Sequence, residues 1–388
     1  MKRLSILSLT LSPLVLLASC GSGYSTGEEA GDATSTPAPV DPTETAFSIT
    51  EHGSFDEPWA AAFLPGTDRL FITEKPGTLK FVNTKDGTVG TVTGLPEVDY
   101  GGQGGLGDIA FLPREARLRS AMRTIYLSWV EAGEGDTRGA VVGRGQMICP
   151  TTTQCAISDL EVIWRQSPKV TGRGHYSHRI VFSPDERYMY VASGERQKLE
   201  PAQDTSNTLG SIVRLNLDGT PAADNPVGDE IWSYGHRNIL GMDFDAQGRL
   251  WEVEHGPAGG DELNLVKRGA NYGWPTRSYG DHYDGRDIPD HTADDGFAKP
   301  AAVWTPVIAP GNMVIYRGDL FAGMKGDALI SGLSSKALVR VAIDGETARE
   351  VGRYAMDKRI RSVIEGPDGA LWVLEDGEGG RLLELRPG

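Results

Sequence analysis

The stretch Gly369-Ala-Leu-Trp-Val-Leu-Glu375 carries the pattern that decides the fold. A tight turn leads into a short run of aromatic, aliphatic and β-branched residues, which is typical of a buried β-strand. Five further copies of this pattern occur, with an aromatic or leucine in the place of Trp372: DRLFITE (68–74), RTIYLSW (123–129), ERYMYVASGE (186–195), GRLWEVE (248–254) and GDALISG (326–332). Because the copies recur every 43 to 78 residues, they indicate a repeat architecture.

Six copies predict an all-β fold, a six-bladed β-propeller. A pair of β-sandwiches is the alternative, but it does not account for the recurrence. Additional strands fit between the copies, at Thr78–Val82, Ser211–Leu217 and Leu338–Ile343, and the best short helical segment is Arg114–Met122. Closure of the ring is predicted from pairing of Ala46–Thr50 with Arg381–Arg386.

The composition agrees with one large domain that contains many turns. The chain has 388 residues, including 50 Gly and 23 Pro, and a net charge of −15. An acidic chain lacks the basic face that phosphate binding needs, so we expect no nucleic-acid partner.

The first residues predict export rather than folding. Lys2 and Arg3 precede an apolar run too short to span a membrane, as in a secretory signal. The end of that run, Leu-Ala-Ser-Cys20, resembles a bacterial lipobox; a plain signal peptide with a chance cysteine is the alternative. We therefore divide the chain into a signal peptide (1–19), a disordered acidic tether lipidated at Cys20 (20–45) and the propeller domain (46–388). We expect the protein on the periplasmic side of a bacterial membrane, with the lipid as its sole membrane contact. Because Gly21 follows Cys20, as in lipoproteins sent to the outer membrane, we expect that membrane to be the outer one.

Cys149 and Cys155 flank a five-residue loop. In an oxidising compartment such a pair predicts a disulfide, and two thiols without nearby histidines make a poor zinc site.

Unusual polar residues gather in the loops between the predicted strands. His175 is a candidate general base, because histidine has a near-neutral pKa, although a lone loop histidine is often an exposed residue with no catalytic role. Arginines suit carboxylates, with surface ion pairs as the alternative. The Gly256–Pro257 turn offers carbonyl oxygens of the kind that Ca²⁺ prefers. The candidate ligand-binding side chains are Gln103, Arg196, Arg237, Asn238, Arg359 and Arg361. Together these loops predict a site for a small molecule with several carboxylates, held with a divalent cation.

The runs GGQGGLGD, GHYSHRIVFSPD, IWSYGHRN, EHGPAGGDELN, NYGWP and RIRSVIEGPDG resemble the soluble pyrroloquinoline quinone (PQQ)-dependent aldose sugar dehydrogenases, or glucose/sorbosone dehydrogenase family. The resemblance extends over about residues 48–386 and implies a six-bladed propeller that holds PQQ and Ca²⁺. It implies that His175 takes the proton of the anomeric hydroxyl while hydride passes to quinone C5. It also implies that the carbonyls of Gly256 and Pro257 ligate Ca²⁺, that Asp261 supports this turn, and that the candidate side chains contact the quinone.

Three positions depart from the family pattern. A cofactor-contacting lysine is replaced by Ser334, with Lys336 two residues on, and Arg196 stands where some relatives carry an amide. We predict that Arg196 or Lys336 restores the missing charge. Ile239-Leu240 replaces the Pro-Gln pair of the family, which makes the opening of the predicted site less polar.

The resulting prediction is an enzyme that oxidises an aldose-type sugar or sorbosone-like aldehyde at C1 and passes electrons to an acceptor, such as a basic cytochrome. A Ca²⁺-dependent lactonase or esterase on the same fold, and a non-catalytic glycan-binding propeller, are the alternative interpretations.

Overall fold

The computed structural model describes residues 47–388. The predicted signal peptide, the tether and the lipidation of Cys20 lie outside the described residues. The described chain is all-β, as predicted, and its helices are three short 3-10 turns: η1 (Pro113–Arg117), η2 (Glu200–Gln203) and η3 (Ala322–Met324). The helix expected within Arg114–Met122 is limited to η1. In residues 47–388 no helix has the length and apolar character needed to cross a bilayer.

Most strands form four-stranded antiparallel sheets. One sheet contains β10 (Ser177–Phe182), β11 (Tyr188–Ser193), β12 (Ser211–Asn216) and β13 (Ile231–Tyr234). The next contains β14 (Ile239–Phe244), β15 (Leu250–Glu254), β17 (Asp261–Leu265) and β19 (Ala302–Trp304). A third contains β20 (Pro310–Ile315), β21 (Ala328–Gly332), β22 (Ala337–Asp344) and β23 (Thr347–Ala355). The fourth contains β24 (Ile360–Glu365), β25 (Leu371–Glu375), β26 (Gly380–Pro387) and β1 (Phe47–Phe55). A two-stranded ribbon pairs β16 (Ala258–Gly259) with β18 (Gly280–Asp281).

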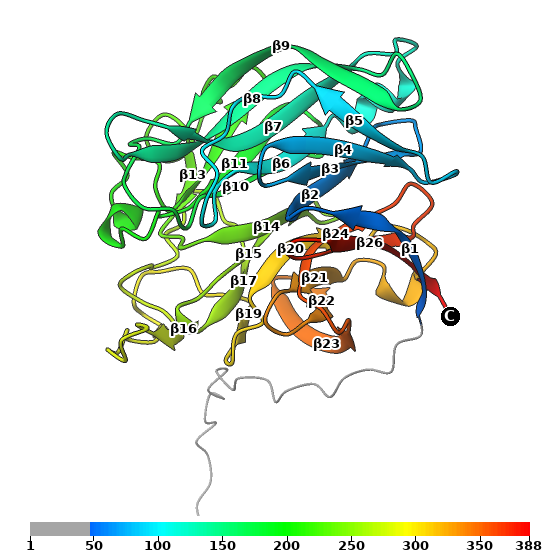
Figure 1. Ribbon diagram of the computed structural model, residues 1–388. Coiled ribbons are helices and arrows are strands. Elements are labelled where there is room, and N and C mark those ends of the chain that lie inside the picture. The colour runs from blue at the N-terminus through cyan, green and yellow to red at the C-terminus, as the bar shows by residue number, and fades with distance from the viewer. Residues whose placement is uncertain (1–46) are drawn as a thin grey trace, which may run out of the picture. The chain divides into compact units, whose positions relative to one another are not determined.

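The N-terminal part differs from the expectation of separate sheets, because its eight strands form one sheet (Figure 1). One antiparallel half contains β2 (Pro58–Phe63), β3 (Arg69–Glu74), β4 (Thr78–Asn83) and β5 (Val89–Thr93). The other contains β6 (Leu106–Phe111), β7 (Arg123–Ala132), β8 (Arg138–Ile148) and β9 (Gln154–Arg165). A short parallel pairing of β5 with β9 joins the two halves.

Each copy of the repeated pattern is the second strand of a four-stranded unit: β3, β7, β11, β15, β21 or β25. The first strands contact one another in a closed order, from β2 through β6, β10, β14, β20 and β24 back to β2. The repeat therefore marks units that follow one another around a common centre.

The core lies between neighbouring units, and the repeated residues explain it. Phe71, Tyr126, Tyr190, Trp251, Leu329 and Trp372 each lie in a different buried cluster. Neighbouring positions on a strand point to opposite faces. Phe71 accordingly packs with Ile125 of the following unit, whereas Leu70 and Ile72 pack with Trp372 of the last unit. Both faces of these strands are buried, which is why the repeats read as nearly continuous apolar runs.

Pairing of the two ends of the described chain is confirmed. β1 runs antiparallel to β26, with Ser48 opposite Arg386 and Glu51 opposite Leu383 (Figure 1). The ring of Phe47 also lies 5.0 Å from that of Tyr354 and 5.6 Å from that of Phe321, measured between centroids.

We expect deletion of residues 1–55 to lower the melting temperature by roughly 10 °C, because it removes one strand of the sheet that joins the chain ends and exposes apolar surface worth several kcal/mol. Thermal unfolding followed by circular dichroism measures this. The matched control lacks residues 1–46 and keeps β1. Equal melting of the two variants would show that the pairing contributes no stability.

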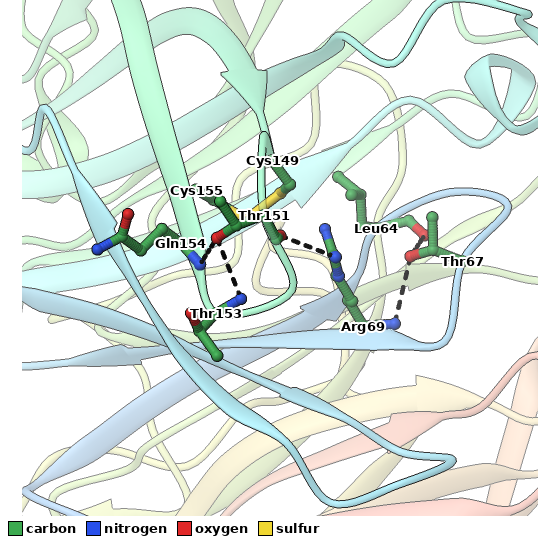
Figure 2. Close-up of a disulfide and its surroundings, with 8 residues drawn as sticks. All are labelled: Leu64, Thr67, Arg69, Cys149, Thr151, Thr153, Gln154 and Cys155. Carbon is green, nitrogen blue, oxygen red and sulfur yellow. Dashed lines mark hydrogen bonds between the residues drawn. A yellow bond between two sulfur atoms is a disulfide. The ribbon is translucent and has the colours of Figure 1, made fainter.

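Cys149 and Cys155 form a disulfide across the β8–β9 turn (Figure 2). Within this turn Thr151 Oγ1 accepts the N–H of Gln154 at 2.9 Å, and Arg69 donates to the Thr151 carbonyl at 3.1 Å. Cys155 lies opposite Val92 in the parallel β5–β9 pairing. The disulfide therefore holds the turn beside the junction of the two N-terminal halves.

Candidate functional site

Strand direction explains why the predicted loops meet. In every unit the start of the first strand pairs with the end of the second, as in Ser177 with Ser193, Ile239 with Glu254 and Ile360 with Glu375. Segments just before the first strands and just after the second strands therefore lie at one end of the ring. A cavity of about 200 Å³ opens there, lined by Trp59, Lys75, Gly102, Gln103, Tyr176, Ser177, His178, Asn238, Leu240, His255, Leu333, Arg359 and Arg361.

Arg359 and Arg361 bring positive charge to this cavity. Asp376 lies between them and accepts the Nε–H of Arg359 and the Nε–H of Arg361, each at 2.8 Å. Burial alone would raise the pKa of Asp376, but the two guanidiniums hold it below its ordinary value. One carboxylate therefore relieves part of the repulsion between these two like charges. A single carboxylate for two cations still leaves a net positive charge.

His175 and Glu195 form a buried pair beside the cavity. His175 Nδ1 is in close hydrogen-bond contact with Glu195 Oε1, and Glu195 Oε2 accepts the N–H groups of Lys198 at 2.6 Å and Leu199 at 2.8 Å. Burial alone would raise the pKa of Glu195, but the bonds from His175 and the main chain hold it below its ordinary value. An ionised Glu195 places the imidazole proton on Nδ1, which leaves Nε2 as a proton acceptor.

Burial lowers the pKa of His175, and the nearby charge of Arg237 adds to this effect, against the raising influence of Glu195. The imidazole is therefore neutral at neutral pH. Its backbone is held in an unusual conformation, because His175, Ser177 and His178 all have positive φ (49°, 58° and 52°). Such backbone strain in residues other than glycine clusters at functional sites.

Two predicted amides join the same region. Gln103 Oε1 accepts the main-chain N–H of His175 at 2.7 Å, so it lines the cavity and also holds the His175 loop. Asn238 lines the cavity and accepts the Ser177 hydroxyl at 3.3 Å. Glu254 fixes the loop that carries Asn238, since its Oε2 accepts the N–H groups of Arg237 at 2.6 Å and Asn238 at 3.1 Å.

Arg237 does not line this cavity but a smaller one, which it shares with Gly256 and His255. Its guanidinium donates to the His255 carbonyl at 3.0 Å and to the exposed Tyr283 hydroxyl at 3.3 Å. Its Nε–H is buried and has no partner among residues 47–388. An unsatisfied buried donor is costly.

The Gly256–Pro257 turn lines an adjoining groove together with His255, Asp261 and Tyr283. Asp261 Oδ1 accepts the Gly256 N–H at 2.9 Å and Oδ2 accepts the Ala309 N–H at 2.6 Å, which fixes the turn. Burial raises the pKa of Asp261 to about 6, against these hydrogen bonds. Among the described residues nothing donates to the Gly256 or Pro257 carbonyls. Both oxygens therefore fit the ligand set of a hard cation such as Ca²⁺.

The structure corrects the prediction for Arg196. Its side chain is fully buried, and its three nitrogens donate to the carbonyls of Gly174 at 2.8 Å, Arg138 at 2.8 Å and Gly172 at 2.6 Å. The guanidinium also lies 3.8 Å from the Tyr176 ring centroid. The side chain is enclosed in this way and does not line the cavity, and Arg196 instead holds the loop that carries His175.

The lysine of the cavity wall is Lys75, which the sequence prediction missed. Its Nζ lies 3.2 Å from Glu57 Oε2. Ser334 donates to the Val307 carbonyl at 2.9 Å, and neither Ser334 nor the exposed Lys336 lines the cavity. The lysine of the cavity wall therefore comes from a different unit of the fold than Ser334.

Comparison with known proteins confirms the resemblance seen in the motifs. The model of the family described as Glucose / Sorbosone dehydrogenase matches residues 55–384. The Escherichia coli (strain K12) protein named aldose sugar dehydrogenase YliI is 36% identical over 343 residues, which cover 86% of this chain and 90% of that protein.

Solved structures agree with this match. The soluble aldose sugar dehydrogenase from Escherichia coli in its apo-form has a TM-score of 0.81 at 35% identity, covering 88% of this chain and 100% of that one. The PQQ-bound form of aldose sugar dehydrogenase from Streptomyces coelicolor has a TM-score of 0.69 at 27% identity, covering 88% and 98%. The family match takes in β2 to β25 and most of β26, but of β1 only its last residue, and it includes the whole cavity. The chain therefore belongs to the Glucose / Sorbosone dehydrogenase family.

Proposed function

We propose that the protein is a PQQ-dependent dehydrogenase that oxidises aldose-type sugars at C1 with the help of Ca²⁺. The observation that carries this proposal is one cavity lined by Arg359 and Arg361 beside the buried His175–Glu195 pair. Relatives named aldose sugar dehydrogenase, one of them with PQQ bound, support the same activity.

The scaffold of this proposal is a six-bladed β-propeller. The eight-stranded sheet would then be two blades joined edge to edge through β5 and β9, and the four separate sheets would be the other four blades. The closed order of first-strand contacts, with one apolar cluster for each repeated residue, supports this interpretation. The cavity would lie at the mouth of the central channel.

The side chains of the cavity suit an oxygen-rich planar anion. Arg359, Arg361 and Lys75 supply cationic donors, and Gln103 and Asn238 supply amide groups. When bound, PQQ supplies the oxidant, a quinone that accepts hydride from C1 of the sugar. The protein's own part is to hold this group in a fixed orientation.

His175 performs the proton step. Its neutral Nε2 accepts the proton of the C1 hydroxyl, and the resulting imidazolium is stabilised by ionised Glu195 at Nδ1. The hydrogen bond from the His175 N–H to Gln103 and the bonds made by Arg196 keep the loop in place. The Gly256 and Pro257 carbonyls would hold Ca²⁺, which would supply a Lewis acid.

Other features of the protein are proposed on the sequence alone. A lipid at Cys20 would attach the enzyme to the periplasmic side of a bacterial membrane, and a redox protein such as a cytochrome would accept its electrons. None of the relatives compared above supports a lactonase, an esterase or a non-catalytic glycan-binding protein.

Reconstitution tests the proposed function. Purified protein is mixed with PQQ and Ca²⁺, and reduction of a redox dye is followed with a panel of aldoses. We expect dye reduction that requires PQQ and at least one sugar, and that is lost when a chelator removes Ca²⁺. Dye reduction absent for every sugar, with no quinone retained after gel filtration, would contradict the proposal.

A further inference from the structure

His178 is a second histidine of the cavity, three residues after His175, and the mechanism above gives it no part. Its ring lines the cavity but is only 2% exposed as a residue. It stacks on Trp59, with ring centroids 4.8 Å apart and planes 29° apart. Space for it depends on Gly107, where an added Cβ would lie 1.9 Å from His178 Cε1. The imidazole is therefore held in one position at the wall of the cavity.

Hydrogen bonding determines which ring nitrogen of His178 carries the proton. Ser128 Oγ accepts the N–H of Asp108 at 2.7 Å and lies 2.9 Å from His178 Nδ1. The Ser128 hydroxyl has one proton to donate, and among the described residues His178 Nδ1 is the acceptor within its reach, so we take the hydroxyl to donate to Nδ1. Burial, together with the charge of Arg179, lowers the pKa of His178 to about 3, so the ring is neutral. A neutral ring that accepts at Nδ1 is protonated at Nε2.

The two histidines consequently have opposite hydrogen-bonding character. The partner of His175 at Nδ1 is a carboxylate, which leaves Nε2 as an acceptor, whereas the partner of His178 is a hydroxyl, which leaves Nε2–H as a donor. Nothing in residues 47–388 accepts a hydrogen bond from this Nε2–H. A donor at the wall of a cavity that also holds Arg359 and Arg361 matches an oxygen of the ligand those arginines attract.

We propose that His178 is a cofactor-binding residue whose Nε2–H donates a hydrogen bond to an oxygen of the bound quinone. The proposal rests on the proposed function, because it takes PQQ as the occupant of the cavity. The proposed contact is a hydrogen bond from a neutral ring, in addition to the charged contacts that Arg359 and Arg361 would make.

Binding of PQQ to matched variants tests this contact. The dissociation constant is measured by quenching of tryptophan fluorescence at fixed Ca²⁺, with folding checked by circular dichroism. We expect His178→Phe, which keeps a flat ring and removes the donor, to weaken binding roughly 10- to 100-fold. His178→Gln restores an N–H near the Nε2 position and should bind within a few-fold of the wild type. A folded His178→Phe protein with wild-type affinity would overturn the proposal.

A second measurement, nitrogen NMR, reads the protonation of His178 in the wild-type protein. In protein labelled with ¹⁵N-histidine, we expect His178 to show the Nε2–H form before and after PQQ is added, with its Nε2 resonance displaced by PQQ. His178→Gln assigns the resonance. An Nδ1–H form, or an Nε2 resonance unmoved while PQQ is bound, would overturn the proposal. Failure of the wild-type protein to bind PQQ would instead contradict the proposed function itself.

Discussion

Replacing His175 by alanine is expected to lower kcat by about 10²- to 10⁴-fold, the usual contribution of a general base, while the affinity for PQQ changes by only a few-fold. The reason is that the cationic and amide side chains of the cavity, rather than His175, would hold the cofactor, while the Nε2 of His175 accepts no hydrogen bond from the described chain and is left for the proton step. Single-turnover reduction of the reconstituted enzyme measures the first quantity, and fluorescence titration with PQQ measures the second. Retained turnover in a folded His175→Ala protein would contradict the assigned role.

Glu195→Gln tests the same role through the partner of His175, because it keeps the size of the side chain and removes the charge next to Nδ1. Burial already holds the pKa of His175 below its ordinary value, so wild-type turnover is expected to stay constant near neutral pH and to fall only as acid protonates Nε2. The hydrogen bond to Glu195 raises the pKa of His175 and so opposes the effect of burial. Replacement of Glu195 should therefore move the acidic limb of the pH profile to lower pH and reduce kcat, since a neutral amide stabilises the imidazolium less.

A limb that moves to higher pH in Glu195→Gln would mean that the carboxylate does not act through the His175 proton. A purely structural role would change the melting temperature and leave the position of the limb unmoved. The pH profile therefore separates positioning of the base from general stability.

Much of the fold could be predicted because each unit repeats one physical requirement. The second strand of every unit is buried on both faces, so residues such as Phe71, Trp251 and Trp372 leave the same apolar signature in the sequence. The parallel pairing of Val89–Thr93 with the start of β9 could not be predicted in this way. It joins edge strands far apart in the chain, and an edge strand carries no local mark of its partner.

The same repeat also contains information on the site that the sequence prediction did not use. Second strands end at the mouth of the cavity, so the residue just after each of them is a candidate site residue. Lys75 follows β3, His255 follows β15 and Asp376 follows β25. Each lies in the cavity wall or holds the arginines of that wall.

Side-chain direction was the part that the sequence could not supply. Glu195 and Arg196 are adjacent and equally polar, yet one contacts His175 and the other is enclosed by three carbonyls. Both Arg196 and the following Gln197 have positive φ (61° and 58°), which departs from the alternation of a regular strand. A pattern based on strand periodicity cannot assign faces through such a turn.

Replacing both Arg359 and Arg361 by alanine is expected to weaken PQQ binding by about 10²- to 10⁴-fold, because each charge-assisted hydrogen bond to a carboxylate is worth about 1.5–3 kcal/mol. Asp376 holds both side chains at Nε, and among the described residues no protein group accepts from the terminal nitrogens of Arg359. The double variant also leaves Asp376 without its partners, so a negative charge would face the cofactor carboxylates.

Arg317→Ala is the control for this loss, since it removes an arginine paired with Asp243 that does not line the cavity. Fluorescence titration at two salt concentrations measures the effect. Wild-type affinity should fall as salt rises, because screening weakens the attraction between the arginines and the anionic cofactor, and the double variant should lose most of this dependence. Wild-type affinity and salt dependence in a folded double variant would show that the cofactor does not bind between these arginines. The cavity would then have to be assigned to a different ligand.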